Sequence, residues 1–198
     1  FYFDMRQTQR EPGHDWAAIF DVRKPLSFDV VMQGFTEKEL KNVVGLQASF
    51  FSELYLSHRD DDSDYIYYQT YPRICALSEV AWQGKGGEWQ SFYAKLVESH
   101  YSRMKAMGID FRLFPPTVSY DNGLLKASTD DCSHIYYKIV GDDKEYIYKA
   151  PIATDKPQCY AFYTRQAGAH SPEAALKGRW RMLQPKVTIT SSIKESER

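Results

Sequence analysis

The segment of residues 45–82 constrains the fold of this chain more than any other. An almost continuous apolar run at residues 43–51 leads into a single carboxylate at Glu53. Such a run is typical of a parallel strand that is buried on both faces. A helix is expected to follow, and Pro72 either kinks it or starts its second part, because proline lacks a backbone N–H. A polar group at the end of a strand, followed by a helix, is how a β/α barrel builds its active site.

Two motifs, taken in order, carry a resemblance to a known family. One reads Gly45-Leu-Gln-Ala-Ser-Phe-Phe-Ser-Glu53 and, after a variable stretch, Tyr71-Pro-Arg-Ile-Cys-Ala-Leu-Ser-Glu79-Val-Ala-Trp82. The other combines Tyr2-Phe-Asp4 with Glu11-Pro-Gly-His-Asp-Trp16. Together they resemble the end of the catalytic barrel of glycoside hydrolase family 20, the β-N-acetylhexosaminidases. The resemblance covers about the first half of the chain. It implies the last two strands and helices of a (β/α)8 TIM barrel over residues 1–110.

The same resemblance implies roles for five side chains. In this family the substrate's own 2-acetamido oxygen attacks the anomeric carbon, so no carboxylate acts as nucleophile. Tyr2 would be catalytic, donating its hydroxyl to that acetamido oxygen. Asp4 and Glu53 would accept hydrogen bonds from sugar hydroxyls, and Trp16 would offer a flat apolar face to the ring. Phe51 would line the acetamido pocket. The resemblance implies no metal and no other cofactor.

Three of these positions leave room for a second interpretation. Tyr2 also fits a core tyrosine, and Asp4 fits a turn residue at the end of a strand. Phe51 stands where the family has Trp. Since Phe is smaller and has no indole donor, the pocket is expected to be looser or to accept a different ring.

The chain lacks the family's general acid. Family members carry the acid/base Glu and its Asp partner side by side in a His-x-Gly-Gly-Asp-Glu motif, and the 198 residues contain no Asp-Glu dipeptide. A complete barrel takes about 250 residues, far more than precede Gly108. We therefore expect an inactive C-terminal fragment. Two barrel strands leave exposed edges, so we expect it to associate with itself or with the missing portion.

The second half of the chain predicts a helix and then a small β domain. Apolar residues recur at helical spacing over residues 88–107, and Gly108 suits the C-terminal cap. We interpret this stripe as core packing, with His100 as a core histidine.

Short β-like runs follow a proline-containing linker at residues 111–116, and turn residues separate them. The runs lie at residues 124–127, 135–140, 146–149, 160–164 and 186–192. They resemble the fibronectin-like antiparallel β-sandwich often attached to these enzymes, here over residues 111–190. Residues 191–198 would be a tail or the start of a further domain.

Composition excludes several classes of function. Lys and Arg total 25 against 26 Asp and Glu with no basic stripe, which argues against a nucleic acid partner. No apolar run approaches the roughly 18 residues that a membrane span needs. Three cysteines do not make a disulfide framework; Cys132 and Cys159 could pair if their distance allows, while Cys75 is expected to be a buried thiol.

These observations favour part of a retaining, substrate-assisted β-N-acetylhexosaminidase. Its partner would be a glycan ending in N-acetylglucosamine or N-acetylgalactosamine, and the resemblance implies a secreted or periplasmic protein. A non-catalytic carbohydrate-binding protein derived from such an enzyme is the alternative, which the substitution at Phe51 favours slightly. For residues 117–190 a structural spacer is preferred to a sugar-binding module, because no exposed aromatic triad is evident there.

Overall fold

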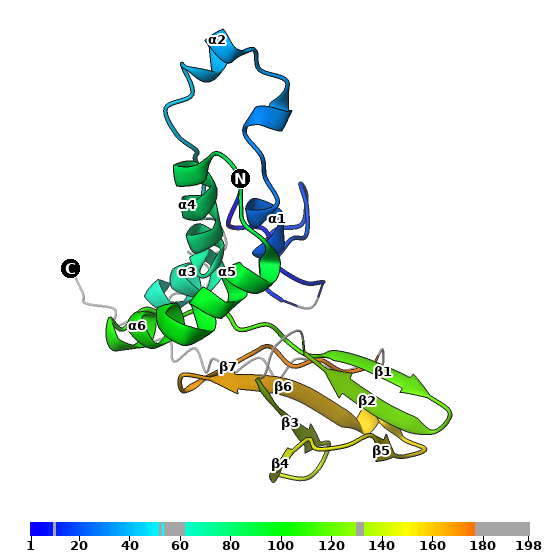
Figure 1. The fold of residues 1–198 in the computed structure, drawn as a ribbon. Helices are drawn as coiled ribbons and strands as arrows, with labels where there is room; N and C mark the ends of the chain where they lie inside the picture. Colours follow the sequence, from blue (N-terminus) through cyan, green and yellow to red (C-terminus); the bar gives the residue numbers. More distant parts are fainter. Residues whose placement is uncertain (10, 52, 54–61, 130–132, 177–198) are drawn as a thin grey trace, which may run out of the picture.

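The computed structural model describes residues 1–176 apart from residues 10, 52, 54–61 and 130–132, with residues 62–64 described by their backbone alone. A helical part formed by the first half of the chain lies above two antiparallel sheets in Figure 1. None of the helices described is long and apolar enough to cross a membrane.

The two segments expected to be parallel strands meet in one short contact. Tyr2 and Ser49 form a single parallel bridge, in which the N–H of Phe3 donates to the carbonyl of Ser49 at 2.7 Å. The chain then turns, and the N–H of Met5 donates to the carbonyl of Tyr2 at 3.3 Å. The parallel pairing of the two segments was predicted correctly. The prediction of two full strands was wrong, because this turn ends the extended backbone.

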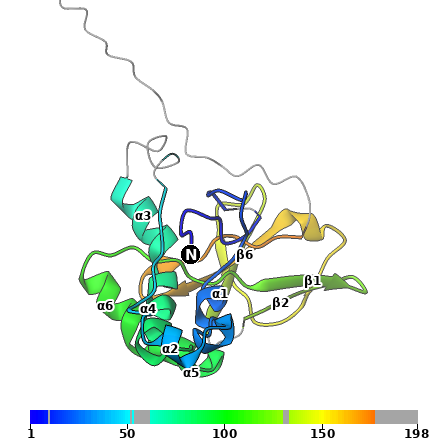
Figure 2. The same cartoon turned by 90° about the horizontal axis from the view of Figure 1, so that it is seen from above.

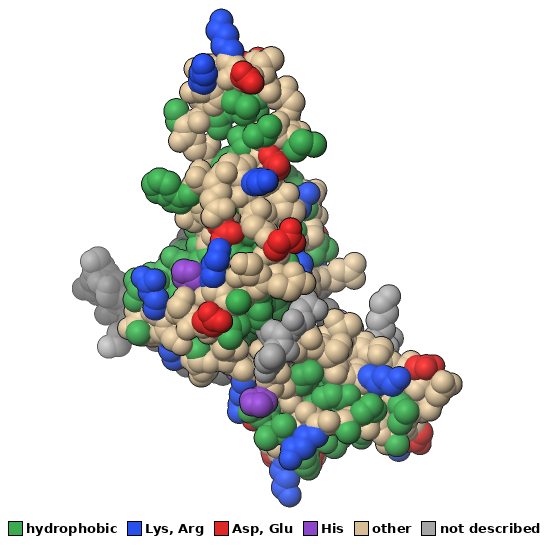
Figure 3. Space-filling view, in the orientation of Figure 1, with side chains coloured by type: hydrophobic (Ala, Val, Ile, Leu, Met, Phe, Trp, Pro, Cys, Tyr) green, Lys and Arg blue, Asp and Glu red, His purple; other side chains and the backbone are tan. Residues whose placement is uncertain are grey.

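The prediction that residues 43–51 are buried on both faces is wrong. Val44 is fully exposed, at 100%, and Phe51 is exposed too. This segment is paired at Ser49 alone, and no layer of described residues covers Val44. Hydrophobic side chains also reach the surface of the lobe that carries helix α2 (Glu37–Leu40), which forms the top of the molecule in Figure 3.

The short elements of this lobe follow local rules. They are the 3-10 turn η1 (Val31–Gln33) and α2, whereas α1 (Arg23–Leu26), which precedes them in the sequence, lies below the lobe and adds Leu26 to the core. Thr36 and Glu39 form a capping box at the start of α2, in which the Glu39 N–H donates to Thr36 Oγ1 at 3.3 Å. In return, the Thr36 N–H donates to Glu39 Oε2 at 2.9 Å. Two otherwise orphan donors are thereby satisfied.

Two helices fill the segment between residues 62 and 83. They are α3 (Asp62–Thr70) and α4 (Arg73–Gln83). Of the two roles proposed for Pro72, the structure shows the second, because Pro72 immediately precedes the first residue of α4. The charged run at residues 59–64 lies partly outside the described residues, and its residues 62–64 form the start of α3.

The predicted long helix is continuous, with a wider turn at its middle. It comprises α5 (Trp89–Lys95), the π-helical turn η3 (Leu96–His100) and α6 (Tyr101–Ala106). Gly108 follows at φ 69°. The predicted apolar stripe is confirmed as core, with Phe92, Tyr93, Leu96, Tyr101 and Met104 buried against Val22, Leu26, Ala76, Phe111 and Leu113.

Among the described residues, seven strands form two antiparallel sheets. The first has the order β1 (Thr117–Asp121), β2 (Leu124–Ser128), β5 (Ile152–Ala153). The second has the order β4 (Glu145–Ile147), β3 (His134–Ile139), β6 (Tyr160–Gln166), β7 (Ala169–His170), with the 3-10 turn η4 (Pro157–Cys159) before β6. Four predicted runs are confirmed as β2, β3, β4 and β6, whereas β1, β5 and β7 were missed. The run predicted at residues 186–192 lies outside the described part of the chain.

The sheets share a small apolar core. Leu125, Ile135 and Phe162 are buried in it, one each from β2, β3 and β6. Asn122 and Gly123, at φ 50° and 77°, make the two-residue turn between β1 and β2. Positive φ at both positions is what a type I′ hairpin requires. Viewed from above, this hairpin extends away from the helices (Figure 2).

Candidate functional site

Three side chains expected to line a sugar pocket lie together, and we call them the aromatic cluster. The ring centroid of Tyr2 is 5.2 Å from that of Trp16 and 5.6 Å from that of Phe51, on which it stacks. Exposed fractions of 39% for Tyr2, 63% for Trp16 and 44% for Phe51 show that the cluster faces solvent. The interpretation of Tyr2 as a core tyrosine is therefore wrong. An exposed group of aromatic rings suits the apolar face of a ligand.

Backbone pairing brings these rings together from three segments. The parallel bridge at Ser49 sets the segment that carries Phe51 beside Tyr2. The loop before Trp16 returns to the first segment through a second parallel bridge, between Met5 and His14. There the His14 N–H donates to the carbonyl of Asp4 at 2.9 Å. The cluster therefore depends on pairings between residues that are distant in sequence.

Asp4 is a buried acceptor without a donor. It lies in the turn that follows Tyr2, as the turn interpretation proposed, yet its exposed fraction is 0%. Neither carboxylate oxygen has a hydrogen-bond partner within the part of the chain that the structure describes. A buried carboxylate left in this state is costly and calls for an explanation. Its chemistry matches that of a group that accepts hydrogen bonds from a ligand.

Glu53 is placed differently. It is exposed in a turn two residues after Phe51. The reason given for singling it out, an unpaired carboxylate after a buried strand, is wrong because that segment is not buried. Its contact with a sugar therefore stays a prediction from the resemblance. Across the described residues, no group of three or more His, Cys, Asp or Glu side chains could hold a metal ion.

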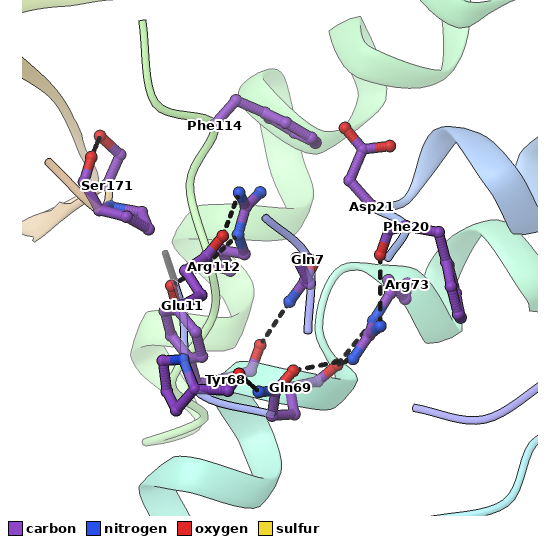
Figure 4. A network of polar contacts seen from close by, with 12 residues as sticks. Gln7, Glu11, Phe20, Asp21, Tyr68, Gln69, Arg73, Arg112, Phe114 and Ser171 are labelled. Carbon is purple, nitrogen blue, oxygen red and sulfur yellow. Dashed lines mark hydrogen bonds and ion pairs between the residues drawn. The ribbon is translucent and has the colours of Figure 1, made fainter. Parts of the chain in front are cut away.

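Arg73 supports the backbone beneath the cluster. Its buried guanidinium donates to the carbonyls of Phe3, Met5 and Gln69, and the bond to Met5 is 2.9 Å long. Figure 4 shows the contact of Arg73 with Gln69. Burial lowers the pKa of Arg73 to about 9, so it stays protonated at neutral pH. Sequence reasoning noted Arg73 only as part of the helix motif. Its function here is to hold the turn that contains Asp4.

A buried ion pair joins the loop after the first segment to the linker. Arg112 Nε donates to Glu11 Oε1 at 2.6 Å and Arg112 Nη2 donates to Glu11 Oε2 at 3.0 Å (Figure 4). The Tyr68 hydroxyl donates to the same carboxylate at 2.6 Å. Burial by itself would raise the pKa of Glu11, but the hydrogen bond and charge of Arg112, with the Tyr68 and Thr8 hydroxyls, lower it overall. No sequence signal could have found this pair, because 101 positions separate its members.

Comparison with known proteins explains the parallel pairing and the motifs. Residues 1–85 match the profile of the glycosyl hydrolase family 20 catalytic domain. The match covers less than half of the chain. The match implies a portion of a TIM barrel and an origin in a glycoside hydrolase.

A relative extends the similarity beyond the family 20 segment. A beta-hexosaminidase of Akkermansia muciniphila is 28% identical to this chain over 110 residues. The aligned stretch is 55% of the chain but 21% of that enzyme, so the chain spans about a fifth of its relative's length. The tyrosine and the four substrate-binding positions predicted from sequence all fall within residues 1–85.

Proposed function

We propose that this chain supplies one wall of the active site of a retaining, substrate-assisted β-N-acetylhexosaminidase. The enzyme would remove terminal N-acetylglucosamine or N-acetylgalactosamine from glycans. One observation carries the proposal: within the segment that matches the family 20 profile, three aromatic rings form an exposed cluster. The buried carboxylate of Asp4, two residues after Tyr2, has no donor among the described residues. A secreted or periplasmic location belongs to the same proposal and is based on the family resemblance.

Each side chain has a role that its chemistry allows. The Tyr2 hydroxyl donates to the acetamido carbonyl oxygen as this oxygen attacks the anomeric carbon. Trp16 and Phe51 cover the apolar side of the sugar. Asp4 and Glu53 accept hydrogen bonds from sugar hydroxyls, and such bonds to a charged group contribute about 1.5–3 kcal/mol each. The proposal assigns binding and orientation to this chain.

The chain by itself is proposed to be inactive. Departure of the aglycone needs a proton, and the Asp-Glu pair that would supply it occurs nowhere in the sequence. Incubation with an aryl N-acetylglucosaminide should therefore give no turnover above the rate without protein. Robust turnover would overturn this part of the proposal.

Sugar binding tests the remaining part directly. A calorimetric titration of the chain with N-acetylglucosamine should show saturable binding, and the Trp16→Ala substitution should abolish it. Trp82→Ala is the matched control, because Trp82 is also exposed, at 88%, but lies at the end of α4 outside the aromatic cluster. Equal losses in both variants, or no binding at all, would contradict the assignment of the cluster.

A non-catalytic carbohydrate-binding protein is the second candidate, favoured by Phe51 in place of the family's Trp. Sequencing of the gene upstream of the codon for Phe1 separates the two. A His-x-Gly-Gly-Asp-Glu motif there would support the enzyme. A barrel without that pair would support a relative that binds sugar and has lost catalysis.

For the two sheets we propose a fibronectin-like sandwich that serves as a spacer, over residues 111–190. The division into three and four antiparallel strands supports this fold. Tyr137, Tyr148 and Tyr160 pack against the core between the sheets, which supports a spacer over a sugar-binding surface. A loss of glycan affinity on replacing the half-buried Tyr136 with Ala would argue for a sugar-binding role instead.

A further inference from the structure

A cavity of about 120 Å³ lies where the helical part meets the sheets. Its walls include Asp21 and Arg23 from the N-terminal segment, Trp89 from α5, Arg112 and Phe114 from the linker, and Ser128 from β2. None of the three rings of the aromatic cluster lines it. The cavity is thus separate from the candidate sugar site.

Arg112 brings an unused donor to this cavity. Its side chain is 1% exposed, and its Nε and Nη2 atoms are committed to Glu11. The remaining nitrogen, Nη1, has no hydrogen-bond partner among the residues described. In Figure 4 Phe114 and Asp21 lie on the side of the Arg112 guanidinium away from Glu11. A buried guanidinium nitrogen facing a cavity requires an acceptor inside it, because an unsatisfied donor is costly.

The charged groups at the cavity occur in two pairs. Arg23 pairs with Asp21 in the lining, and Arg112 pairs with Glu11 beside it, so two positive charges face two negative ones. Asp21 already binds Arg23, whose Nη1 lies 2.8 Å from Asp21 Oδ2. Trp89 also holds Arg23 in position, with the guanidinium carbon 4.3 Å from its ring centroid. The kind of acceptor therefore follows from the geometry of the guanidinium donors and not from a net charge.

The size of the cavity limits this acceptor further. A volume of about 120 Å³ holds roughly four water molecules at about 30 Å³ each, or one small anion. The Ser128 hydroxyl on the sheet side can donate to such an anion. Guanidinium groups match the planar geometry of carboxylate and phosphate oxygens better than that of a simple halide.

We propose that this cavity is a binding site for a small oxyanion, a carboxylate or a phosphate, held by Nη1 of Arg112 with Arg23 and Ser128. Bound there, the anion satisfies the buried guanidinium and links the helical part to the sheets. The site is independent of the proposed hexosaminidase function, because it shares no side chain with the aromatic cluster.

The experiment is thermal unfolding of the 198-residue chain at pH 7 in sodium phosphate, sodium acetate or sodium chloride at matched ionic strength. One oxyanion salt, or both, should raise the melting temperature saturably, while chloride should not. At ten times the dissociation constant, the ratio of folded to unfolded protein should rise about elevenfold. A response to phosphate alone, or to acetate alone, identifies the source of the oxyanion. Equal melting temperatures in all three salts would mean a water-filled cavity and would overturn the proposal.

Variants locate the effect. Arg23→Gln should weaken anion binding at least about tenfold, because it removes one charge-assisted hydrogen bond. Arg103→Gln is the matched control. Arg103 is exposed on α6, so this substitution removes the same charge at a position away from the cavity. Ser128→Asp adds a repelling carboxylate to the lining and should abolish anion binding measured by calorimetry. This variant tests the site even if Arg23→Gln does not fold. An equal loss in Arg103→Gln, or unchanged binding in Ser128→Asp, would refute the site.

Discussion

The helical part and the two sheets differ in the polar and aromatic side chains that they bury and expose. Four charged side chains are buried among the described residues, namely Asp4, Glu11, Arg73 and Arg112, and all belong to the helical part and its linker. The same part exposes the aromatic cluster. In the sheets, the buried polar side chains described are Thr164 and Ser171, and aromatic rings pack around the core.

This difference fits the proposal that the helical part carries the sugar site and that the sheets serve as a spacer. Buried charges and exposed rings cost stability, and proteins retain such features where binding or catalysis needs them. In the sheets Leu125, Ile135 and Phe162 are buried, and the Thr164 hydroxyl donates to the Phe114 carbonyl at 2.7 Å. The four predictions below test this contrast.

Breaking the buried ion pair should give the largest effect. Glu11→Ala leaves Arg112 buried without its partner, so the free energy of unfolding should fall by about 3–5 kcal/mol in urea titrations. Glu145→Ala is the control from the sheets, because its pair with Arg165 is partly exposed and should contribute no more than about 1 kcal/mol. Similar losses in the two variants would erase the contrast between the regions.

A phenylalanine pair tests the apolar side of the contrast. Phe162→Leu, in the core between the sheets, should reduce the free energy of unfolding by about 1–3 kcal/mol, because it leaves unfilled volume. Phe51→Leu, in the exposed cluster, should change it by no more than about 0.5 kcal/mol. Chemical unfolding measures both, and a greater loss at Phe51 would show that the cluster is structural.

Asp4→Asn should act in the opposite direction. Removing the charge of a buried carboxylate that has no donor in the described part of the chain should increase the free energy of unfolding by about 1 kcal/mol. Binding of N-acetylglucosamine should weaken in the same variant, since a charged acceptor becomes a neutral amide. A destabilised variant with unchanged sugar affinity would instead make Asp4 a structural residue.

The smallest expected effect is the loss of stability at acidic pH, which should not be seen near pH 7. The pKa of Glu11 is lowered from its usual value of 4.5, so its stabilising contribution is complete above that value and is lost as the pH falls through the lowered pKa. The urea midpoint should therefore drop between about pH 5 and about pH 3. The drop should be shallower in Glu11→Gln, whereas Glu145→Gln should retain the wild-type profile. If Glu11→Gln keeps the wild-type pH profile, a group other than the Glu11–Arg112 pair causes the loss of stability in acid.

Local features were predictable because neighbouring residues determine them. The capping box at Thr36 and Glu39 and the turn at Asn122 and Gly123 each depend on a few adjacent side chains and backbone angles. The stripe of the long helix repeats at the helical period, so its buried face could be read from the sequence. Strands β5 and β7, which have two residues each, are too short to show an alternating pattern.

The sequence by itself determined the family segment, the types of side chain in the candidate site and the order of helix and β runs. Only the tertiary structure decided that Tyr2, Trp16 and Phe51 share one exposed face, that Asp4 is buried without a donor, and that Arg112 binds Glu11 beside a cavity. The physical reason is distance along the chain. Periodicity and capping act over a few residues, whereas these contacts join segments tens of residues apart through packing.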